Sequence, residues 1–144
     1  MATNNKQWYL VTGGARRIGK AIALGLHADG ANVAIHYNSS EQSAAELADD
    51  LNAARPGSAI SLQADLGSLD SLKQMTSKLL KHCGRLDGLV NNASSFYATP
   101  LAELTEADWD NLMGSNLKGP LFLSQQVQKA LTDTQGCIVN IIDI

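Results

Sequence analysis

The residues with the clearest chemical potential are the glycines and arginines of the stretch TGGARRIG, residues 12–19. They follow a short apolar run and precede a segment of helical period, so we expect them at the turn between a strand and a helix. Free backbone amides and the positive end of the helix dipole make such a turn an anion site, and phosphate is its natural occupant. The stretch therefore predicts a phosphate-binding loop.

Two kinds of phosphate site compete for this loop. Read from Gly14, the letters GARRIGKA nearly fit the P-loop of nucleotide triphosphatases, but Ala21 stands where a magnesium-binding hydroxyl is required. The alternative is a dinucleotide site, although the glycines at 13, 14 and 19 do not match the usual GxGxxG spacing. The missing hydroxyl favours the dinucleotide.

The end of the second apolar run bears on which dinucleotide is bound. An NAD site usually has an acidic residue there that accepts a hydrogen bond from the ribose 2′-hydroxyl. This sequence instead offers hydroxyl and amide groups that can donate to a 2′-phosphate, at Tyr37, Asn38, Ser39 and Ser40. Glu41 is the nearest carboxylate, and we interpret it as a first-turn helix acid favoured by the helix dipole. The pattern favours NADP over NAD.

These residues must be positioned by strands that alternate with helices. Short apolar runs occupy residues 8–12, 32–37, 59–64, 86–93 and 137–143, and segments of helical period occupy 18–28, 40–54, 68–82 and 105–131. Such alternation indicates an α/β protein with a doubly wound parallel sheet in a three-layer α/β/α arrangement. Ser68 and Thr105 are suitable helix caps. The pair Gly119–Pro120 falls inside the last helical segment, so we expect a break or kink there that divides two helices.

Composition excludes several classes of function. A net charge of -3 argues against general nucleic-acid binding, which depends on clustered basic residues. No apolar run reaches the roughly 20 residues that span a bilayer, and the first residues lack the apolar core of a secretion signal. Cys83 and Cys137 have no further ligands at metal-binding spacing, so we expect free thiols and no metal site. These features predict a cytoplasmic protein.

In this order, the motifs resemble those of the short-chain dehydrogenase/reductase family. The loop at 12–19 is similar to its TGxxxGxG motif, ADL at 64–66 to its adenine-contacting turn, and NNAS at 91–94 to its NNAG motif. Asn116 and IVNIID match later landmarks. Within the family, the paired arginines and the stretch NNASSFYATPL are similar to the pteridine reductases. The resemblance implies a Rossmann-type fold and NADP as cofactor.

The same resemblance assigns the residues around the cofactor. Arg17 is expected to reach both the cofactor phosphates and the substrate. Asp65 is expected to contact adenine, and Asn92 to bridge strands. The full set of expected cofactor contacts is Gly13, Arg16, Arg17, Ile18, Gly19, Tyr37, Asn38, Ser39, Ser40, Ala64, Asp65, Leu66, Asn92, Ala93 and Ser94.

Asp143 indicates the substrate, because most of these reductases have serine there. A serine hydroxyl can donate to the alkoxide that forms from a ketone, whereas a carboxylate repels that charge. Hydride addition to a C=N bond leaves a basic nitrogen that needs a proton, and a carboxyl of raised pKa can help to supply it. Phe96 can stack on a flat heterocycle and Ser94 can bond its edge. By resemblance, Asn116 is the water-holding catalytic Asn, and the predicted reaction is NADPH-dependent reduction of a pterin or dihydrofolate.

The family's Tyr-x-x-x-Lys pair is absent from this sequence, since Gly13, Glu41 and Leu101 stand four places after its tyrosines. We therefore expect residues 1–144 to be one NADP-binding domain, a fragment of a reductase of roughly 250 residues. The sheet would then be incomplete on its C-terminal side. The fragment alone should bind NADP weakly without turnover, and the whole protein should be a homotetramer, as relatives usually are. A reductase of a carbonyl such as a 3-oxoacyl carrier protein, or a non-catalytic dinucleotide-binding module, remains the alternative.

Overall fold

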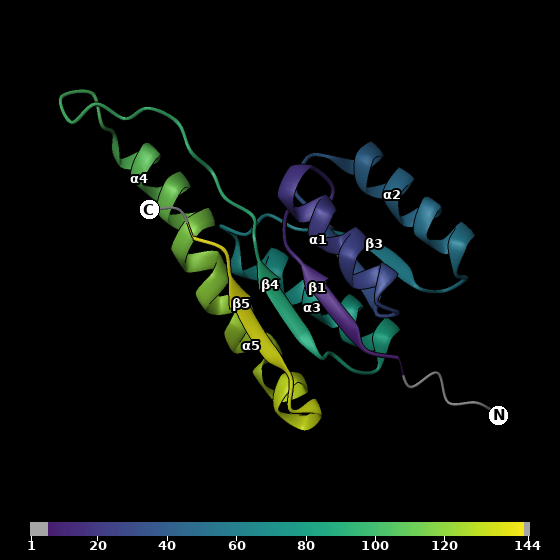
Figure 1. Cartoon of the computed structure of the whole chain (residues 1–144). Coiled ribbons are helices and arrows are strands. Elements are labelled where there is room, and N and C mark those ends of the chain that lie inside the picture. Colours follow the sequence, from purple (N-terminus) through teal and green to yellow (C-terminus); the bar gives the residue numbers. More distant parts are fainter. Residues whose placement is uncertain (1–5, 143–144) are drawn as a thin grey trace.

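The computed structural model describes residues 6–142, which fold around a parallel five-stranded sheet (Figure 1). The strands are β1 (Trp8–Val11), β2 (Asn32–Tyr37), β3 (Ala59–Gln63), β4 (Gly88–Asn91) and β5 (Cys137–Asn140). Their spatial order is β3-β2-β1-β4-β5, and every neighbouring pair is parallel. The order reverses direction between β1 and β4, and the edge outside that point is where open α/β sheets bind ligands.

Helices cover both faces of the sheet. They are α1 (Arg17–Ala28), α2 (Glu41–Ala54), α3 (Leu69–Cys83), α4 (Glu106–Met113), the π-helical turn η1 (Gly114–Lys118) and α5 (Gly119–Thr134). One apolar core joins the sheet to α1 and α2, with Ile35 and Leu47 fully enclosed. The other core joins it to α3 and α5, with Leu72 and Leu123 enclosed. The predicted three-layer Rossmann-type arrangement is confirmed.

The helices differ in how their N-termini are satisfied. The Ser68 hydroxyl accepts a hydrogen bond from the Ser71 amide at 3.3 Å, as expected for the start of α3. Thr105 and Asp108 form a reciprocal capping box at the start of α4. No described side chain caps α1 or α2. The first-turn amides of these two helices therefore remain available to a ligand.

The expected break at Gly119–Pro120 takes a different form. The chain stays helical from α4 into α5, and the division is the π-helical turn η1 immediately before Gly119. Pro120 lies in the first turn of α5, where its missing amide hydrogen interrupts the regular pattern without ending the helix. A Cβ on Gly119 would lie 2.8 Å from the Leu66 Cβ. Glycine therefore allows this helix to pack closely on the turn after β3.

Strand β5 is at the edge of the sheet and pairs only with β4 among the described strands. Its side chains are exposed, including 41 % of Ile138 and 45 % of Val139. This agrees with the expected open edge. Cys137 on β5 and Cys83 at the end of α3 are both free thiols. Within residues 6–142, no helix combines the length and apolar character needed to cross a bilayer.

Candidate dinucleotide and substrate clefts

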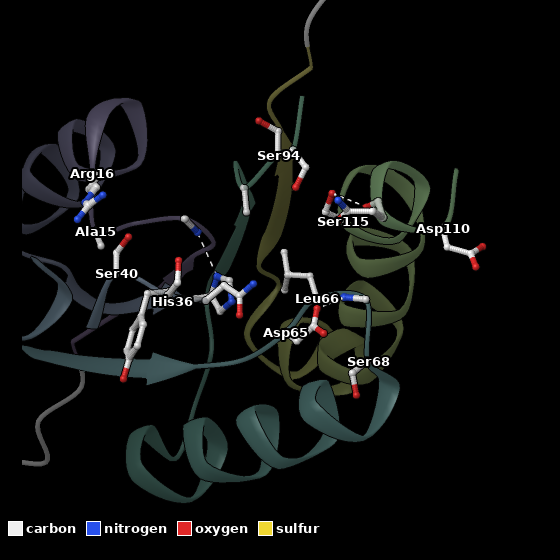
Figure 2. Close-up of a pocket in the computed structure, with 18 residues that line it drawn as sticks. Ala15, Arg16, His36, Ser40, Asp65, Leu66, Ser68, Ser94, Asp110 and Ser115 are labelled. Atoms are coloured by element: carbon white, nitrogen blue, oxygen red, sulfur yellow. Dashed lines mark hydrogen bonds between the residues drawn. The ribbon is translucent and has the colours of Figure 1, made fainter. Parts of the chain in front are cut away.

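A cleft of about 480 Å³ opens at the carboxyl end of the sheet, between the ends of β1, β2 and β3 and the start of η1 (Figure 2). Ten of the residues expected to contact the cofactor line it: Gly13, Arg16, Tyr37, Asn38, Ser39, Ser40, Asp65, Leu66, Ala93 and Ser94. These residues come from four separate segments of the sequence. The topology thus brings together most of the expected cofactor contacts.

The glycine loop, residues 12–19, is tied to the end of β4. The Thr12 hydroxyl accepts hydrogen bonds from the amides of Asn92 at 2.9 Å and Ala93 at 3.0 Å. The Asn92 side chain donates back to the Thr12 carbonyl at 3.0 Å, which agrees with its expected bridging role. A Cβ on Gly19 would lie 2.1 Å from the Gly13 carbonyl oxygen, so only glycine fits there. These contacts therefore fix the position of the loop beside the cleft.

The two arginines of the loop have different positions. Arg16 lines the cleft, and its Nε donates to the Ser43 hydroxyl on α2 at 3.2 Å. Arg17 adopts a left-handed backbone with φ of 49°, a conformation that non-glycine residues adopt at an energetic cost. Arg17 and its neighbour Ile18 are not among the described residues that line the cleft. Their contacts with the cofactor stay a prediction.

The end of β2 has the hydroxyl-rich character predicted for it. Ser39 and Ser40 line the cleft, and Ser40 is the N-terminal boundary of the uncapped helix α2. Glu41 lies in the first turn of α2, as expected, and is not among the described lining residues. Burial raises the pKa of Tyr37, and the Glu41 carboxylate raises that pKa further. Arg16, the hydroxyls and the helix end together form a site that suits a phosphate group.

Asp65 is organised by local hydrogen bonds. Its Oδ1 accepts from the Gly67 amide at 2.8 Å, and its own amide donates to the Ser71 hydroxyl at 2.9 Å. The side chain is exposed at the cleft. Ala64 is fully buried, and it is not among the described residues that line the cleft. This turn can therefore present one fixed carboxylate to a ligand.

A second cleft, of about 610 Å³, adjoins the first and shares Ala93, Ser94 and Ser95 with it. Phe96 and Asn116 also line it. The Phe96 side chain is 93 % exposed, so it does not belong to the core. The shared residues make the two clefts continuous, as a cofactor and a substrate that react with one another require.

Two side chains, those of Asn116 and Tyr97, anchor the loop that carries Phe96. Asn116, in η1, donates through Nδ2 to the Ser95 carbonyl at 2.8 Å and accepts from the Ser95 amide at 3.1 Å. The Tyr97 hydroxyl accepts from Asn111 at 3.3 Å. Hydrogen bonds from Thr105 and then from Tyr97 lower the pKa of Asp108. The backbone is thus anchored on both sides of Phe96, and the π-helical turn places Asn116 for this contact.

Two residues of the site were not predicted from the sequence. Tyr97 anchors the loop, and its signal was only its position next to the expected stacking residue. His36 contacts both the glycine loop and the turn after β3, and its signal was a histidine directly after the apolar residues of the run NVAIHY. Asp143 lies outside the described residues, so its expected catalytic role is untested.

A parallel sheet of this order, with a glycine loop and two uncapped helix N-termini at one cleft, defines a dinucleotide-binding α/β protein. Comparison with protein families identifies which one. Residues 7–143 match the short chain dehydrogenase family, and the chain belongs to that family.

Three curated relatives illustrate the range within the family. The chain is 38 % identical to "Pteridine reductase 1" from Leishmania tarentolae, in an alignment that covers 93 % of this chain and 60 % of the relative. It is 38 % identical to "Hydroxynaphthalene reductase-like protein Arp2" from Metarhizium robertsii, over 81 % of this chain and 43 % of the relative. It is 34 % identical to "3-oxoacyl-[acyl-carrier-protein] reductase FabG" from Staphylococcus epidermidis, over 94 % and 55 %. The chain thus spans about half the length of these relatives.

Proposed function

We propose that this chain is the cofactor-binding part of an oxidoreductase that uses NADPH to reduce a C=N bond in a pterin or dihydrofolate. The observation that carries this proposal is the continuity of a phosphate-suited cleft with a second cleft that presents an exposed Phe96. Similarity to a pteridine reductase over 93 % of the chain supports the same substrate class.

The residues of the first cleft fit a dinucleotide. The amides at the start of α1 suit its pyrophosphate, and the close contact at Gly19 leaves no room for a side chain beneath it. Arg16, Ser39 and Ser40 suit a 2′-phosphate at the start of α2. The bound dinucleotide would supply the hydride. Asp65 would accept from the adenine amino group.

The residues of the second cleft would orient the substrate. Phe96 would stack on a flat heterocycle and Ser94, which lines both clefts, would bond its edge and the cofactor. Asn116 would keep this loop in place through its two bonds to Ser95. Asp143 would help to protonate the ring nitrogen after hydride addition. The family resemblance also implies a proton-donating Tyr four places before a Lys, and none of the tyrosines in residues 1–144 has a Lys at that position.

Reduction of a carbonyl is the second candidate, favoured by the similarity to a 3-oxoacyl carrier protein reductase and to a hydroxynaphthalene reductase-like protein. Oxidation of NADPH by the intact protein should be followed with dihydrofolate, a dihydropterin and a 3-oxoacyl thioester. Reduction of the first two but not the third supports pterin chemistry, and the reverse result supports the carbonyl. If Asp143→Ser leaves pterin reduction unchanged, the role proposed for Asp143 is wrong.

The preference for NADPH has its own test. Arg16→Ala should weaken NADPH binding about tenfold, because an exposed charge-assisted hydrogen bond contributes about 1.5 kcal/mol. NADH binding should not change, because it lacks the 2′-phosphate. Arg55→Ala, at the opposite end of the sheet, where Arg55 contacts the Gly30 and Ala31 carbonyls, is the control for lost charge. Equal weakening of both dinucleotides by Arg16→Ala would contradict the assignment.

We also propose that the intact protein is a homotetramer. Large apolar side chains are exposed on α4, η1 and α5, at Trp109 (58 %), Leu117 (56 %) and Leu121 (59 %). Surfaces of this kind commonly mark protein interfaces. Light scattering on the intact protein tests the assembly, and a monomer would contradict it. A cytoplasmic location stays a prediction.

A further inference from the structure

His36 is a buried histidine that joins two segments of the first cleft. It lies in β2 with 1 % of its surface exposed. Its Nδ1 is 3.1 Å from the Gly13 amide nitrogen, and its Nε2 is 3.0 Å from the Ala64 carbonyl oxygen. Figure 2 shows the first of these bonds running from the ring to the glycine loop. One side chain thus connects the phosphate-binding loop with the turn that carries Asp65.

The two partners determine the protonation state of the ring. A backbone amide can only donate, so Nδ1 must carry a lone pair. A backbone carbonyl can only accept, so Nε2 must carry the hydrogen. The neutral ring with hydrogen on Nε2 satisfies both partners, whereas the imidazolium ion would direct an N–H at the Gly13 amide. Protonation of His36 is therefore incompatible with the bond to the glycine loop.

The surroundings of His36 favour the neutral ring. Burial lowers its pKa below the ordinary value of 6.5, and the bond to the Ala64 carbonyl opposes this only in part. The segments around this end of the sheet carry other titratable side chains, each exposed or partly exposed: Arg16, Arg17, Tyr37, Glu41, Asp65 and Asp70. Arg16 and Arg17 are cations, and Glu41, Asp65 and Asp70 are carboxylates.

We propose that His36 is a positioning residue for dinucleotide binding, which holds the glycine loop to the turn after β3 as a neutral ring and releases the loop when it is protonated. The inference rests on the proposed function only in taking a nicotinamide dinucleotide as the ligand. Because the neutral form binds, affinity is complete above the pKa of His36 and is lost as the pH falls through it. Linkage to one proton increases the dissociation constant by up to about tenfold per pH unit below that value.

The test compares the intact protein with His36→Gln. The glutamine amide offers an acceptor and a donor but does not titrate. NADPH binding is measured by fluorescence between about pH 5 and 8. The 2′-phosphate of NADPH also titrates, at about pH 6, so the readout is the ratio of the two dissociation constants at each pH. Toward the acidic end of the range the wild-type constant should increase more than that of His36→Gln, by up to about tenfold per pH unit below the pKa of His36.

His27→Gln is the matched control. His27 also has a lowered pKa, caused first by burial, but it bonds Ser58 at 2.7 Å near the opposite end of the sheet. This variant should follow the wild-type pH profile. Identical profiles for wild type and His36→Gln would overturn the proposal while leaving the proposed function intact.

A measurement without cofactor separates the two hypotheses further. Nitrogen NMR of His36 should show the hydrogen on Nε2, and the Gly13 amide should lose protection from hydrogen exchange as His36 titrates. Absence of NADPH binding at pH 8 would contradict the proposed function. The His36 NMR signal and the Gly13 exchange rate would then still test whether His36 holds the glycine loop. The positioning role is overturned if the ring carries its hydrogen on Nδ1, or if the exchange rate of the Gly13 amide does not change as His36 titrates. Both results can be obtained even if His36→Gln fails to fold.

Discussion

Thr12→Val tests whether the glycine loop depends on one buried hydroxyl. Thr12 is 1 % exposed, and its Oγ1 accepts from two backbone amides at 2.9 and 3.0 Å. Valine keeps the shape of the side chain but cannot accept a hydrogen bond, so both amides lose their partner. An unsatisfied buried donor costs about 1 to 3 kcal/mol. Because Asn92 and Ala93 are only partly buried, we take the lower part of that range and expect a loss of about 2 to 3 kcal/mol in total.

The assay is thermal and urea unfolding of the intact protein. At about 3 °C per kcal/mol, the midpoint for Thr12→Val should fall by about 6 to 9 °C. Thr12→Ser keeps the hydroxyl and loses only a methyl group, which costs about 1 kcal/mol. If the two variants differ by less than about 0.5 kcal/mol, the hydroxyl does not hold the loop and the argument is refuted.

Three further predictions follow from other contacts. Gly19→Ala should abolish dinucleotide binding, because its Cβ would lie 2.1 Å from a loop carbonyl; Gly25→Ala, in the same helix with nothing within 4 Å of the added Cβ, should bind normally in the same titration. Tyr97→Phe should increase the KM for the proposed pterin substrate several-fold without changing the KM for NADPH, because it frees the loop beside the second cleft; steady-state kinetics in which only the KM for NADPH increases would contradict this. Iodoacetamide at pH 8 should label Cys137, which is exposed, much faster than Cys83, because burial raises the pKa of the Cys83 thiol to about 12; mass spectrometry of the peptides would reveal equal labelling if this is wrong.

The regular elements could be predicted because their signals are local. The apolar run at 32–37 coincides with β2, and the predicted helix at 68–82 differs from α3 by one residue at each end. Ser68 and Thr105 cap helices as predicted, because their hydroxyls accept from backbone amides in the first turn. The way the helices divide near Gly119–Pro120 was less predictable, because a proline in a first helical turn can be accommodated by a π-helical turn before it. Local sequence does not distinguish this from a break.

The candidate site was predictable where a motif sits on one segment and less so where contacts join several segments. Ser39, Ser40 and Asp65 line the cleft because they follow the ends of adjacent strands. Arg17 does not line it in the described structure, since a resemblance specifies the position of a residue but not the direction of its side chain. Phe96 could be interpreted as core or as a stacking group from its type alone, and its 93 % exposure excludes the core.

The sequence by itself determined the alternation of strands and helices, the glycine loop and the hydroxyl-rich end of the second strand, because periodicity and turn chemistry act over a few neighbouring residues. Only the tertiary structure decided that His36 bonds Gly13 and Ala64, and that Asn116 anchors Ser95. These partners lie between 21 and 28 residues apart in the sequence. Such contacts depend on the order and register of parallel strands, which bring distant residues to one edge of the sheet and which no local pattern encodes.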